Sequence, residues 1–275
     1  MVDTIRAAVA QIDIQLFNVL ANTDRTIEAV TQAAAASCDL VVLPELANVG
    51  YVSNWSPEFA KEYYEHAEKV PGPYSEALTA AASRNDIHVV VGIAERDPTL
   101  DGVMFNSALL ITPTGQIHKY HKIHLPREEK RYFAEGNRLD PVQTELGSIG
   151  LLVCADNSFP ESARLLALRG AQVIAIPYAA ESTTNPVLYH QLAATRAYEN
   201  QVFIACANRC GRQDSLMFAG TSAIAAPDGT LLVELGKDRA LGWADLDLNL
   251  LTSERLRQTR YRDRRPRLYE DISRQ

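Results

Sequence analysis

The first third of the chain alternates short apolar runs, rich in β-branched residues, with longer stretches of helical periodicity. Residues 5–12 have the pattern of a strand, and Ile27, Val30 and Ala34 recur at helical spacing on one face of the next segment. The run DLVVLPE predicts a buried strand that ends at Pro44. This alternation predicts an α/β sheet whose strands are joined by helical crossovers.

The pattern continues through the middle of the chain. A helix is predicted over residues 74–84 and a strand over 88–95, and residues 107–125 form two extended runs around the turn sequence Pro-Thr-Gly at 113–115. Further elements are a strand at 148–156, a helix with a glycine stop at 161–170 and a strand at 171–178.

The second half repeats the order of the first. A helix is predicted over 187–200, a strand over 201–209 and a hairpin over 221–235 around Pro-Asp-Gly. Because strand, helix, strand and Pro-x-Gly hairpin occur twice, the sequence predicts an αββα sandwich of two face-to-face sheets flanked by helices. No Gly/Ser/Pro-rich linker interrupts the chain, so we expect a single domain over residues 1–275.

Composition and charge narrow the classes of function. The 275 residues, 47% hydrophobic and 22% charged, are typical of a globular protein with an extensive core. A net charge of −7 argues against a general affinity for nucleic acid or for an anionic membrane, because both need a positive surface field. The N-terminus lacks a basic leader and no apolar stretch approaches membrane-spanning length, so we expect a cytoplasmic protein.

The four cysteines are too few and too irregularly placed for a disulfide framework, which favours a reducing compartment. Cys206 and Cys210 could indicate a metal site, but no second Cys or His pair stands at a matching spacing. We therefore expect no metal ion, with Cys206 as a buried strand residue.

The C-terminal segment RLRQTRYRDRRPRLYE is rich in arginine. It could be a nucleic-acid patch, but the interspersed acidic residues and the negative net charge favour a subunit-contact tail over residues 253–275. A homodimer or higher homo-oligomer is therefore expected.

Three polar side chains stand near predicted strand ends, where α/β proteins commonly place their chemistry. These are Glu45, Lys122 and Cys154. Because a helix begins soon after Cys154, backbone N–H groups such as that of Ala155 could lower the thiol pKa and hold an oxyanion. The alternative is a buried structural thiol.

Glu45 and Lys122 are weak signals alone, because such residues are frequently helix caps or solvated side chains. His118, His121 and His124 leave open a metal site or a Cys–His nucleophile pair. A spacing of three in an extended segment would, however, scatter their rings over both faces.

Together these segments resemble the nitrilase superfamily, whose members carry a Glu–Lys–Cys triad in this order. The resemblance covers essentially the whole chain and rests on PEL with Gly50–Tyr51, YHKIHL, CADNSFPE, RAYEN, ANRCG, the PDG hairpin and DRRPRLY. In the loop REEKRYFAEGN, many amidases of the family place a second glutamate, which corresponds to Glu129. The chain departs from the family pattern at Ala155 and at Tyr178–Ala179, positions that concern the shape of the pocket.

The resemblance implies Glu45, Lys122, Cys154 and Glu129 as catalytic residues, with Tyr51, Ala155 and Tyr178 at the substrate. It also implies a small carboxamide as substrate and no metal or organic cofactor. The segment CADNSFPE does not resemble the Cys–Trp–Glu signature of true nitrilases or the Cys–Asn–Asp–Arg signature of carbamoyl hydrolases. These two activities are the alternatives, and a non-catalytic amide-binding protein is a third.

In the chemistry that the resemblance implies, Glu45 takes the proton of the Cys154 thiol. A free cysteine and a free glutamate differ by about four pKa units, which is about 5–6 kcal/mol against proton transfer from thiol to carboxylate. We therefore expect the site to raise the pKa of Glu45 by burial and to lower that of Cys154 through the charge of Lys122.

Overall fold

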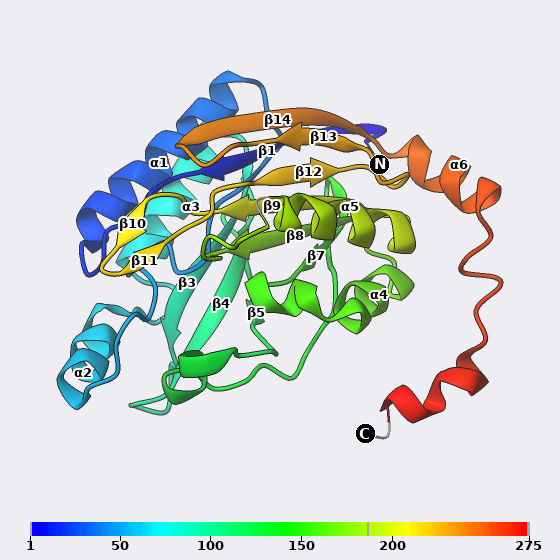
Figure 1. Ribbon diagram of the computed structural model, residues 1–275. Helices are drawn as coiled ribbons and strands as arrows, with labels where there is room; N and C mark the ends of the chain where they lie inside the picture. Colours follow the sequence, from blue (N-terminus) through cyan, green and yellow to red (C-terminus); the bar gives the residue numbers. More distant parts are fainter. Residues whose placement is uncertain (1, 186, 274–275) are drawn as a thin grey trace.

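The computed structural model describes residues 2–185 and 187–273. Two six-stranded mixed sheets lie face to face, and helices cover both outer faces (Figure 1). The predicted αββα sandwich is therefore confirmed.

The first sheet has the strand order β14-β1-β2-β3-β4-β5. β1 to β3 run parallel, and the hairpin strands β4 and β5 and the edge strand β14 pair antiparallel. Its strands are β1 (Thr4–Gln11), β2 (Leu40–Val42), β3 (His88–Arg96), β4 (Met104–Ile111), β5 (Ile117–His121) and β14 (Ala240–Asp247).

The second sheet has the order β13-β12-β9-β8-β7-β6, with a parallel centre formed by β7, β8 and β9. Its strands are β6 (Val142–Thr144), β7 (Gly147–Leu151), β8 (Val173–Tyr178), β9 (Phe203–Asn208), β12 (Ala223–Ala225) and β13 (Leu231–Glu234). The Pro-Asp-Gly turn joins β12 to β13, as predicted.

The helices pack in two outer layers. α1 (Val19–Ala35) and α3 (Pro73–Asn85) cover the first sheet, and α4 (Pro160–Leu168) and α5 (Leu188–Asn200) cover the second (Figure 1). The alternation along β1 explains this arrangement, because Ala7 and Val9 face the other sheet whereas Ala8 and Ala10 face the helices. Both faces of the strand are thus buried.

Several elements were not predicted. α2 (Pro57–His66) and the short hairpin of β10 (Arg212–Gln213) and β11 (Leu216–Met217) lie in segments that the sequence pattern left unassigned. β14 returns to the first sheet and pairs with β1 along its full length. The two halves are therefore less alike than their repeated order suggested.

The C-terminal segment comprises α6 (Asn249–Arg257) and the 3₁₀ helix η3 (Pro266–Ser273), joined by a stretch that runs outside the sandwich (Figure 1). In the described ranges, no helix combines the length and apolar character that crossing a bilayer requires.

Candidate active site

The three predicted strand-end residues follow three different strands. β2 ends at Val42 and β7 at Leu151, so Glu45 and Cys154 each stand three residues beyond their strands. Lys122 directly follows β5, and its backbone N–H donates to the carbonyl of Asn106 (2.8 Å). The side chain of Lys122 is completely buried, as is that of Glu45.

The carboxylate of Glu45 accepts hydrogen bonds from three donors. Oε1 accepts from Lys122 Nζ at 2.7 Å and from Asn106 Nδ2 at 2.7 Å, and Oε2 accepts from the backbone N–H of Ala179 at 2.8 Å. Ala179 directly follows β8 of the opposite sheet, and Glu45 N–H donates to the carbonyl of Tyr178 (3.2 Å). Glu45 is thus fixed by both sheets.

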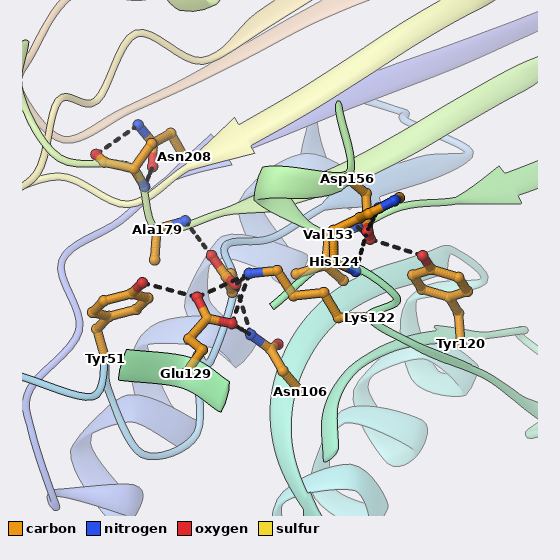
Figure 2. A network of polar contacts seen from close by, with 12 residues as sticks. Tyr51, Asn106, Tyr120, Lys122, His124, Glu129, Val153, Asp156, Ala179 and Asn208 are labelled. Carbon is orange, nitrogen blue, oxygen red and sulfur yellow. Dashed lines mark hydrogen bonds and ion pairs between the residues drawn. The ribbon is translucent and has the colours of Figure 1, made fainter. Parts of the chain in front are cut away.

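Lys122 bridges two carboxylates. Its ammonium donates to Glu45 and, at 2.9 and 2.8 Å, to both oxygens of Glu129, which lies in the 3₁₀ helix η1 (Arg127–Arg131) (Figure 2). Burial alone would lower the pKa of Lys122, but the charges of Glu45 and Glu129 raise it overall. The ammonium is therefore held in its charged form.

Glu129, assigned only through the family resemblance, lies in the same buried cluster. Its Oε1 also accepts a hydrogen bond from the hydroxyl of Tyr51 (2.8 Å), and its Oε2 from Asn106 Nδ2 (3.0 Å). Burial raises the pKa of Glu129, and the charge of Lys122 offsets only part of that shift. Two carboxylates around one ammonium leave the cluster with a formal charge of −1.

Cys154 begins the 3₁₀ turn η2 (Cys154–Ser158) with a positive φ of 45°. A non-glycine residue in this region is strained, and sharp turns of this kind present nucleophiles in other hydrolase folds. Cys154 is half-buried, whereas Cys38, Cys206 and Cys210 are buried. Cys206 lies within β9, as expected for a structural thiol.

The expectation of a lowered thiol pKa is wrong. Burial and the negative charge of Glu45 raise the pKa of Cys154 well above its ordinary value, and Lys122 counteracts this only partly. The physical reason is that burial disfavours the thiolate, and the charges of Glu45 and Glu129, both paired with Lys122, oppose the lowering effect of the ammonium. The raised pKa favours the neutral thiol at Cys154.

A second buried network supports the turn that carries Cys154, and sequence reasoning did not identify it. Asp156 accepts hydrogen bonds from the hydroxyl of Tyr120 (2.7 Å), from the N–H of Val153 (3.0 Å) and from the N–H of His124 (3.0 Å) (Figure 2). Arg196, in the motif RAYEN, donates to the carbonyl of Asn157 (3.0 Å).

The predicted substrate-binding residues lie around the charged cluster of Glu45, Lys122 and Glu129. Ala155 borders an open cavity of about 330 Å³ that Phe159, Pro126 and Arg127 also line. Tyr178 is buried, and its hydroxyl accepts a hydrogen bond from Asn157 Nδ2 (2.7 Å).

His121 and His124 contact carboxylates other than those of the cluster. His121 contacts Glu95 (3.0 Å), and His124 contacts Asp156 (2.9 Å) and stacks on Phe159. Among the described residues, no hydrogen bond joins a histidine to Cys154, which leaves the Cys–His alternative without structural support. Residues 2–185 and 187–273 also hold no group of three or more His, Cys, Asp or Glu side chains placed to bind a metal ion.

Sequence reasoning missed Asn106, and it named Ala179 only for the shape of the pocket, without its contact to Glu45. Asn106 stands near the start of β4, in FNSALL, where a polar residue precedes an apolar run; this was the only signal for it. Ala179 contributes a backbone N–H, which residue type does not reveal.

A family model described as carbon-nitrogen hydrolase matches residues 6–256 of the chain. A protein from Pyrococcus abyssi named nitrilase is 35% identical, over 96% of this chain and 99% of that protein. An (R)-stereoselective amidase from Pseudomonas sp. is 35% identical, over 89% of this chain and 85% of that protein.

Among solved structures, a double mutant of the amidase from Nesterenkonia sp. AN1 in complex with acrylamide superimposes with a TM-score of 0.81. It is 28% identical and covers 98% of each chain. A further structure of that amidase shows covalent addition of the acetamide moiety of fluoroacetamide at its active site cysteine.

Proposed function

The chain belongs to the carbon-nitrogen hydrolase family, within the nitrilase superfamily, and from that premise we propose that it is an amidase that hydrolyses a small carboxamide to a carboxylic acid and ammonia. One observation carries the proposal. Buried Glu45, Lys122 and Glu129 form a single charge cluster that acts on the half-buried thiol of Cys154.

The neutral thiol requires a base during attack. Glu45 accepts the thiol proton as the sulfur bonds to the amide carbonyl carbon, and the electron pair of the C=O bond moves onto oxygen. Proton transfer coupled to attack avoids the cost of forming a free thiolate in a buried, negatively charged site.

The oxyanion of this tetrahedral intermediate is stabilised by Lys122 and by the backbone N–H of Ala155. When the intermediate collapses, the C–N bond breaks, Glu45 returns its proton to the leaving nitrogen, and ammonia departs. Water then attacks the thioester with Glu45 again as base, which releases the acid and regenerates the thiol.

The substrate class is inferred from the comparisons, because the cavity of about 330 Å³ beside Ala155 is lined by none of the four proposed catalytic residues. The covalent adduct of a two-carbon amide in the Nesterenkonia amidase supports this substrate class. The relative named nitrilase makes nitrile hydrolysis the competing activity.

The test compares matched substrates with one acyl group, such as propionamide, propionitrile and a carbamoyl compound, by ammonia release. Intact-mass spectrometry of the quenched reaction follows the acyl-enzyme. We expect turnover of the amide and an acyl adduct on Cys154. Turnover of the nitrile without the amide, or an adduct on another residue, would contradict the proposal.

A further inference from the structure

Asn106 touches both carboxylates of the cluster. Its amide nitrogen donates to Glu45 Oε1 at 2.7 Å and to Glu129 Oε2 at 3.0 Å, and the residue is completely buried (Figure 2). Its backbone carbonyl also accepts the N–H of Lys122. One residue of β4 thus contacts all three charged members of the cluster.

The orientation of this amide indicates a role beyond filling space. Asn106 Oδ1 is buried and has no hydrogen-bond partner among the described residues. Buried polar atoms are normally paired, so an unpaired oxygen is unfavourable. The side chain keeps this orientation because both N–H bonds point at carboxylates, which can only accept.

The contacts of Lys122 explain why the carboxylates need the amide of Asn106 as a further donor. An ammonium has three N–H donors, and the three contacts of Lys122 all go to Glu45 and Glu129. To reach an oxyanion, the ammonium must turn at least one donor away from a carboxylate. That carboxylate then loses a hydrogen bond to the ammonium in a buried site where two like charges repel.

We propose that Asn106 is a positioning residue that holds Glu45 and Glu129 in place while Lys122 turns toward the oxyanion. A neutral amide suits this task because it donates to both carboxylates without competing for the oxyanion as a second cation would. The role rests on the proposed function, since it presupposes that Lys122 stabilises an oxyanion.

Two variants test the proposal. Asn106→Leu removes both donors at similar volume, and we expect kcat to fall by about tenfold to a hundredfold with little change in KM. Asn106→Asp keeps the shape but can donate only when protonated. Its activity relative to the unmodified protein should therefore rise as the pH falls.

Asn48→Asp is the matched control. Asn48 is buried and bonds to the backbone of Ala94, away from the carboxylates. We expect it to lower the thermal unfolding midpoint without changing the shape of the pH profile. If Asn106→Leu does not fold, Asn106→Asp still decides the matter.

A kcat within twofold of the unmodified value in a folded Asn106→Leu protein, or a pH-independent activity ratio for Asn106→Asp, would overturn the proposal. A second measurement separates failure of the Asn106 proposal from failure of the proposed function. It is the rate at which iodoacetamide alkylates Cys154, measured by mass spectrometry at a series of pH values. If no amide is turned over, Asn106→Leu should still change the pH dependence of alkylation, because the carboxylate charges act on the thiol. An unchanged alkylation profile would overturn the role of Asn106 independently.

Discussion

The hydroxyl of Tyr51 donates a hydrogen bond of 2.8 Å to Oε1 of Glu129, so a residue expected at the substrate also holds a member of the charge cluster. Gln213, in the short β10–β11 hairpin, holds the backbone of Tyr51 by accepting its N–H (3.0 Å) and donating to its carbonyl (2.7 Å). Tyr51 therefore links Gln213 to the charged cluster of Glu45, Lys122 and Glu129.

Because of this contact, the Tyr51→Phe variant tests whether Glu129 takes part in the reaction. The variant removes one donor from a carboxylate that keeps Lys122 and Asn106, so we expect a moderate loss of kcat, about threefold to tenfold. Glu129→Gln removes the charge and should cost more. Acyl-enzyme formation and clearance, measured by mass spectrometry with a slowly hydrolysed amide, compare the two. Formation and clearance at the unmodified rate in Glu129→Gln would show that Glu129 has no part in the reaction.

Cys154→Ala should abolish turnover while leaving the fold intact, because it removes the nucleophile but little buried volume. Ammonia release and circular dichroism check the two halves of this prediction. Cys206→Ala is the matched control, a buried cysteine in β9 that should retain turnover. Appreciable activity in the Cys154→Ala protein would refute the cysteine mechanism.

Lys122→Met removes the charged donor that is proposed to stabilise the oxyanion, and we expect turnover to fall at least about a hundredfold, with binding affected less. Steady-state kinetics separate kcat from KM. Lys119→Met is the control, because Lys119 pairs with Glu95 (2.7 Å) outside the cluster. Comparable losses in both variants would indicate a general effect of lost ion pairs.

The pH dependence of kcat/KM should report the charge cluster. In the proposed mechanism Glu129 holds Lys122 as a charged carboxylate, so activity is lost as the pH falls through the pKa of Glu129. Because burial raises the pKa of Glu129, we expect the acid limb above the ordinary glutamate value of about 4.3. Glu129→Gln removes this titrating group, so the limb that it causes should be absent from the pH profile of the variant. An acid limb near the ordinary value in both proteins would contradict the arrangement.

The C-terminal tail is proposed to contact a second subunit. Leu256, Leu268 and Ile272 are 77%, 69% and 64% exposed, which is unfavourable unless another surface covers them. Light scattering after size-exclusion chromatography should give a dimer or larger for the full chain and a smaller species for a chain ending at residue 257. Identical masses for the two chains would assign the contact to another surface.

The sequence determined most of the strands and helices of the sandwich and their order. Apolar residues recur at a period of two in the strands and near 3.6 in the helices because backbone geometry alternates the side chains, and this signal is local. Pro-x-Gly turns mark both hairpins through another local signal, because proline and glycine favour the dihedral angles of turns. The pattern therefore gave the sandwich and located Glu45, Lys122 and Cys154 near strand ends, and the family resemblance added Glu129.

Tertiary structure decided what these residues contact. Asn106 and the N–H of Ala179 meet at Glu45 only because β4 and the end of β8 are brought together by sheet packing, which no local pattern encodes. β14 was missed for a similar reason, since its pairing with β1 joins residues more than two hundred positions apart. The direction of the pKa shift of the Cys154 thiol also depended on the tertiary structure around it. A pKa depends on burial and on every nearby charge together. The sequence predicted the cation of Lys122, but only the structure shows that the thiol of Cys154 is affected by burial and that Lys122 is paired with two carboxylates.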